Sequence, residues 1–244
     1  MNIDGARWLF GSYSGYAATV FNLPVGILAS VGVSVVPIIT KCVTIEDYRK
    51  LNDVLNTAIK LIMISALPCA IIFYTFPEEI LYILFKNTAS SHILRAMSPM
   101  MIILPISGLI SASLYASGKI ALPFFNDTLS TILKIILSYI LIKIPEINIL
   151  GVVISSFIAD IFLLCLNIFS AKKYLHIRLL SVSCITKTSL SACTMYVLCR
   201  SMKNLMQGSL LRFIFVCGTS AMIYLILLLL FGVLKKEEIK SLQT

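Results

Sequence analysis

Two apolar runs joined by a short break, within residues 118–169, constrain the fold of this chain more than any other stretch. Each run holds about 23 residues, which as an α-helix rise roughly 35 Å, enough to cross a hydrocarbon core about 30 Å thick. The break, residues 142–148, reads IKIPEIN. We therefore predict a helical hairpin that crosses a membrane twice.

Other apolar runs extend this pattern along the whole chain. Hydrophobic residues make up 59% of the sequence and charged residues only 13%, more apolar surface than a soluble core can bury. The pattern predicts an all-α, polytopic membrane protein with about seven transmembrane helices, because only helices and closed barrels satisfy the backbone in lipid. The predicted spans lie near residues 13–39, 54–76, 96–117, 120–144, 148–170, 182–202 and 210–234.

Basic residues give the chain a net charge of +9, and they gather in the short loops between the predicted spans. This distribution indicates membrane topology and not nucleic-acid binding, so the expected partners are membrane lipids. The loops richest in Lys and Arg follow the first, third, fifth and seventh spans. We therefore expect the C-terminus to be cytoplasmic and the N-terminus to lie outside, unless an odd number of further spans precedes Met1.

Three charged residues lie inside the two apolar runs of the hairpin: Asp127, Lys134 and Asp160. A charge near the bilayer centre costs at least about 2.5–3.5 kcal/mol, so each needs a partner or a hydrated cavity. Lys134 either faces a central cavity, where it would attract an anionic substrate or take part in ion coupling, or it snorkels or pairs with an acid. Asp160 lies at a similar depth on the return helix, which predicts a structural pair with Lys134.

Polar residues near the start of the hairpin are weaker candidates. Asp127 precedes Lys134 by two helical turns and shares its face, but it lies nearer the expected cytoplasmic end, where water reaches it. Asn126 is a candidate for capping the helix or lining the cavity.

The first span contains Asn22 and Pro24. Because proline removes a backbone donor, Pro24 is expected to kink or break the helix. This break would act as a static kink, as a hinge for alternating access, or as a source of carbonyls for a cation.

Motifs for catalysis are missing from the sequence. We find no nucleophile–base set, no Gly-rich phosphate loop and no metal-ligand spacing, so neither an enzyme nor a cofactor or metal is expected. A coupling cation, H⁺ or Na⁺, is left open.

Short motifs recur in a fixed order along the chain. They are Tyr13-Ser14-Gly15, Asn22-Leu23-Pro24, Val36-Pro37, Gly118-Lys119, Lys134 and Ile147-Asn148-Ile149-Leu150-Gly151. With these motifs the chain resembles the MATE-like (multidrug/oligosaccharidyl-lipid/polysaccharide) exporters, in the branch of stage V sporulation protein B and polysaccharide flippases. That family has two pseudo-symmetric six-helix lobes, often followed by two more helices. Asp160 departs from it, since the family is expected to place an uncharged residue there.

The resemblance implies an organisation and a function. Residues 1–178 would form the second lobe without its first helix, and residues 179–244 the last two transmembrane helices and a cytoplasmic tail. The implied function is a flippase for a lipid-linked oligosaccharide or cell-wall precursor, working by alternating access in the bacterial plasma membrane. The alternatives are a cation-coupled multidrug exporter and a non-transporting membrane scaffold. Since one lobe lacks a cavity partner, we expect a missing N-terminal lobe encoded upstream, or a second copy of the chain.

Overall fold

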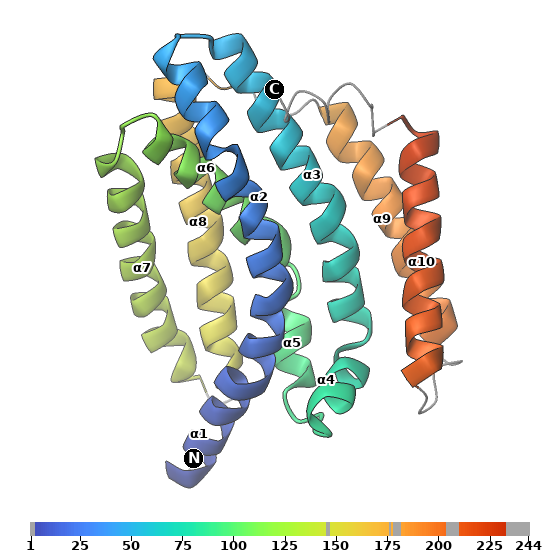
Figure 1. Cartoon of the computed structure of the whole chain (residues 1–244). Helices are drawn as coiled ribbons and strands as arrows, with labels where there is room; N and C mark the ends of the chain where they lie inside the picture. The colour runs from blue at the N-terminus through green and yellow to red at the C-terminus, as the bar shows by residue number, and fades with distance from the viewer. Residues whose placement is uncertain (1–2, 145–146, 176, 178–181, 204–209, 233–244) are drawn as a thin grey trace. The chain divides into compact units, whose positions relative to one another are not determined.

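Helices account for all the regular structure in the described part of the chain. The computed structural model describes residues 3–144, 147–175, 177, 182–203 and 210–232 (Figure 1). The elements are α1 (Ile3–Ser12), the π-helical turn η1 (Tyr13–Ala18), α2 (Thr19–Thr44), α3 (Tyr48–Thr75), α4 (Pro77–Phe85), α5 (Ser91–Met97), α6 (Met100–Ala116), α7 (Ala121–Ile142), α8 (Leu150–Leu175), α9 (Val182–Met202) and α10 (Leu210–Leu230).

Several of these helices are long and apolar enough to cross a membrane. Five qualify within the described residues: Arg7–Thr44, Tyr48–Thr75, Ala121–Ile142, Leu150–Leu175 and Leu211–Leu230. A sixth is added if α5 and α6, which meet at an angle of 44°, act as one broken span. The polytopic helical membrane fold is thus confirmed.

The predicted count of seven spans depends on α9. This helix is 21 residues long but is rich in Ser, Thr and Cys, and it falls outside the apolar set. Its Ser191 and Thr188 are buried, which suits a helix packed against protein more than one facing lipid. The seventh span therefore stays a prediction.

The chain divides into two compact units. Unit 1 comprises the described parts of Met1–Pro24, Ile64–Met101 and Ser181–Lys235, and unit 2 those of Val25–Met63 and Ile102–Leu180. The boundaries fall inside α2, α3 and α6, so these helices contribute residues to both units. The predicted division at residue 178 stays a prediction.

Unit 1 has a core in which α9 and α10 pack together with residues from the end of α3. Phe76 and Phe213 meet edge to face, with ring centroids 6.1 Å apart. Aromatic pairs in this geometry stabilise beyond their buried area. The buried residues of this core are Ile64, Phe76, Ala192, Met195, Cys199, Val216, Tyr224 and Leu228.

Unit 2 has a second core, built by α2, α3, α6 and the end of α8. Gly32 of α2 brings two backbones close, because a Cβ there would lie 3.4 Å from the Cα of Leu109 in α6. The buried residues of this core are Val35, Ile39, Cys42, Leu51, Val54, Leu55, Ala58, Ile59, Ile62, Leu109, Ile110, Leu114, Ala171, Leu175 and Ile177. This core supports the α7–α8 hairpin through α8.

Candidate functional site

The α7–α8 hairpin is the most extensive helix pair of unit 2, and the two helices run side by side (Figure 1). Gly151, at the start of α8, sits against the last turn of α7. A Cβ at Gly151 would lie 2.9 Å from the carbonyl carbon of Leu141. The missing side chain thus lets the two backbones meet and sets the closed end of the hairpin.

Hydroxyl groups link the two helices at two further levels. The hydroxyls of Ser138 and Ser155 are hydrogen-bonded to each other. Closer to the start of α7, Ser130 Oγ donates to the carbonyl oxygen of Ala159 at 2.7 Å. Because lipid offers no competing partners, such contacts help to hold the register of paired membrane helices.

A buried amide network completes the polar contacts at the open end of the hairpin. Asn126 Nδ2 donates to Asn167 Oδ1 at 2.9 Å and to Ser170 Oγ at 3.2 Å. Asn167 is fully buried, and its Nδ2 donates to Ser111 Oγ at 2.7 Å and Ser107 Oγ at 3.3 Å. The network therefore ties α6, α7 and α8 together.

The network changes the interpretation of Asn126. The predicted cap does not form, because α7 begins after Ile120 without a side-chain hydrogen bond to its first turn. Half-buried Asn126 instead acts as an interhelical connector. Asn167 was missed from the sequence, although an Asn inside the apolar run FLLCLNIF is the kind of signal that marks a buried polar contact.

Lys134 and Asp160 lie near one another but do not form the predicted ion pair. Lys134 is exposed on α7, whereas Asp160 is half-buried on α8. Lys134 is close enough to act electrostatically on the Asp160 carboxyl. Yet within the described residues no nitrogen–oxygen contact of 4.0 Å or less joins them. The predicted pair rested on shared depth, which does not determine the direction in which each side chain leaves its helix.

The remaining candidates are Asp127, Asn22 and Pro24. Asp127 is half-buried beside Asn126 and forms no ion pair in the part of the chain that the structure describes. Asn22 is exposed. A break at Pro24 does not occur, because α2 runs without interruption from Thr19 to Thr44, and the predicted kink stays a prediction. The irregularity lies earlier, in η1, and the hinge stays a prediction.

Known proteins resemble this chain over nearly its whole length. The sequence model of the family described as "Lipid II flippase MurJ" matches residues 11–226. The chain belongs to the MurJ lipid II flippase family. The matched region contains the hairpin and every candidate residue named above.

Two individual proteins are similar to this chain. Stage V sporulation protein B of Bacillus subtilis (strain 168) is 22% identical over 239 residues, which are 96% of this chain and 45% of that protein. A solved chain described as lipid II flippase MurJ in an inward closed conformation shares the fold, with a TM-score of 0.69 and 23% identity. The match covers 91% of this chain and 46% of the solved chain. The resemblance to this flippase superfamily is confirmed, and the chain spans about half the length of these relatives.

Proposed function

We propose that this chain is one lobe of a flippase that moves a lipid-linked cell-wall precursor or oligosaccharide across the bacterial plasma membrane. The observation that carries the proposal is the family match over residues 11–226. It favours a flippase over a multidrug exporter or a scaffold. The activity is transport by alternating access between two lobes, without chemical conversion of the substrate. The C-terminus would face the cytoplasm, as the loop charges indicate.

We infer that Lys134 binds the substrate. Its ammonium is exposed on a membrane-spanning helix, where a fixed cation is costly unless it meets water or an anion. The pyrophosphate of a lipid-linked sugar offers such an anion. The nearby Asp160 carboxyl would moderate the field of Lys134 without neutralising it directly. Asn126 and the Asn167 network would position α7 and have no contact with substrate.

A partner is part of this proposal, because α7 has little cover from its own chain. Only 6% of its most apolar stretch is buried inside the structure. A missing N-terminal lobe, or a second copy of this chain, would close the cavity on which alternating access depends.

The proposal is tested by reconstituting the chain in liposomes with a fluorescent lipid-linked sugar pyrophosphate. We expect no flipping by the isolated monomer, and flipping when the N-terminal half of stage V sporulation protein B is reconstituted with it. Lys134→Gln should then reduce the rate strongly, while the matched control Lys143→Gln, at the end of the same helix, should not.

Two results would contradict the proposal. Robust flipping by a monomer alone would remove the need for a second lobe. Equal rates for Lys134→Gln and Lys143→Gln would show that Lys134 does not act on the substrate.

A further inference from the structure

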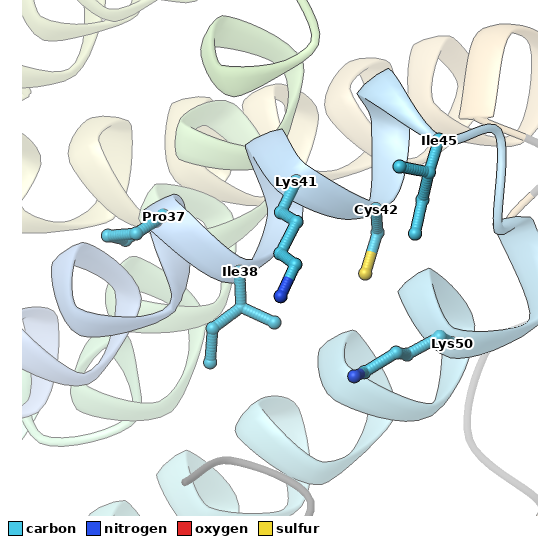
Figure 2. Close-up of a pocket in the computed structure, with 6 residues that line it drawn as sticks. All are labelled: Pro37, Ile38, Lys41, Cys42, Ile45 and Lys50. Carbon is cyan, nitrogen blue, oxygen red and sulfur yellow. The ribbon is translucent and has the colours of Figure 1, made fainter. Parts of the chain in front are cut away.

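A separate pocket lies in unit 2 where α2 ends and α3 begins (Figure 2). Its cavity volume is about 180 Å³. The lining residues are Pro37, Ile38, Lys41, Cys42, Ile45 and Lys50. None of them belongs to the α7–α8 hairpin, so the pocket has a role distinct from that of Lys134.

Two cations converge on this pocket. Lys41 comes from the last turn of α2 and Lys50 from the first turn of α3, and both side chains point into the same hollow (Figure 2). Within the described residues, neither ammonium has a carboxylate oxygen within 4.0 Å. The nearby Asp47 caps α3, since its Oδ1 accepts the backbone N–H of Lys50 at 3.0 Å.

The wall beside these cations is apolar. Pro37 and Ile38 lie about one helical turn before Lys41, which places them roughly 5 Å nearer the middle of α2. The pocket thus offers hydrocarbon on its membrane side and positive charge toward the end of the helix. A lipid has the same polarity at the point where its acyl chains meet a phosphate.

More basic residues lie in the loop and helix-end segments that lead to this end of unit 2. Lys119 and Lys173 flank the ring of Tyr174, with their Nζ atoms 5.6 and 5.4 Å from its centroid. Lysine and tyrosine together are typical of the headgroup level of a bilayer. The location therefore suits an anionic lipid more than a deep substrate.

We propose that the Lys41–Lys50 pocket binds the phosphate of an anionic lipid headgroup. Basic pockets between membrane helices hold such headgroups by direct charge attraction, strengthened where water is partly excluded. The site would anchor the α2–α3 turn to the lipid surface. The inference does not depend on the proposed function, because the binding test needs no transport.

The test uses the full chain in nanodiscs of phosphatidylcholine, with or without phosphatidylglycerol. Ile45 lines the pocket and is 60% exposed, so modification of the thiol in an Ile45→Cys variant by a small thiol reagent, followed by peptide mass spectrometry, reports on occupancy. We expect phosphatidylglycerol to slow the modification. Native mass spectrometry of co-purified phosphatidylglycerol gives a second readout that needs no thiol chemistry.

The deciding variant is the double substitution Lys41→Gln/Lys50→Gln. Loss of two lysine contacts corresponds to about 30-fold weaker retention of phosphatidylglycerol. The control Lys119→Gln/Lys173→Gln removes the same charge from outside the pocket and should retain the lipid.

Three outcomes would overturn the proposal. The first is equal protection of the thiol in Ile45→Cys by phosphatidylcholine alone. The second is an equal loss of lipid in both double variants. The third is protection by inorganic phosphate in phosphatidylcholine discs to the same degree as by phosphatidylglycerol, which would assign the pocket to a soluble anion.

Discussion

The amide network between α6, α7 and α8 gives the sharpest stability prediction. Asn167→Ala removes the acceptor for Asn126 and the donors to Ser111 and Ser107, three hydrogen bonds in all. An interhelical hydrogen bond in a membrane is worth about 0.6 kcal/mol on average and up to about 1.7. The expected loss in the free energy of unfolding is therefore about 2 kcal/mol, before any contribution from the cavity left behind.

A double-mutant cycle isolates the bond that the two amides share. Asn126→Ala removes two hydrogen bonds, to Asn167 and Ser170, and should cost about 1 kcal/mol. Only the 2.9 Å bond is common to both substitutions, so the double variant should be more stable than the sum predicts by about 0.6 kcal/mol. Unfolding by steric trapping in bicelles gives the four free energies.

The control for this cycle is Thr128→Ala. Thr128 is exposed on α7, and its hydroxyl donates only to the Phe124 carbonyl within the same helix. The Thr128→Ala substitution therefore removes a hydroxyl group but leaves the hydrogen bonds between α7 and α8 in place. A coupling energy indistinguishable from zero, or an Asn167→Ala variant no less stable than Thr128→Ala, would refute the network as a source of stability.

Two further predictions follow from packing and topology. Gly151→Ala should lower the free energy of unfolding by about 1–3 kcal/mol, because the added Cβ would lie 2.9 Å from the backbone of α7. Gly108→Ala has open space around the added Cβ, so it should leave the free energy of unfolding unchanged or raise it by up to about 1 kcal/mol. Equal melting temperatures for these two variants would contradict the close approach. Residues 119 and 143 lie at opposite ends of α7, so an impermeant maleimide applied to intact cells should label Lys143→Cys but not Lys119→Cys. The reverse labelling pattern would invert the proposed orientation.

The hairpin could be predicted closely because its length comes from hydrophobicity alone. Runs expected at residues 120–144 and 148–170 correspond to α7, Ala121–Ile142, and α8, Leu150–Leu175. The ends of the first span were predicted less closely, since the helix Arg7–Thr44 extends beyond the predicted residues 13–39 on both sides. Polar residues at the ends of a membrane helix continue it into the headgroup layer, where hydropathy carries little signal.

The contacts within the hairpin were harder to predict. Counting from the turn places Lys134 and Asp160 at one depth, but depth does not determine the direction in which each side chain leaves its helix. That direction depends on how the helices rotate to bury Ser130, Ser155 and Asn167, whose partners lie on other segments. The amide network was therefore visible only in three dimensions.

The polar contacts along α7 and α8 also bear on biosynthesis. While a ribosome is still making α8, α7 holds Asn126 and Ser130 without their hydrogen-bond partners, and an amide or hydroxyl that lacks a hydrogen bond in an apolar medium costs about 2–7 kcal/mol. The short connection, residues 143–149, lets α8 arrive soon afterwards with Asn167 and the Ala159 carbonyl. We expect the translocon to retain α7 until α8 has emerged and to release the two helices into lipid as one insertion unit.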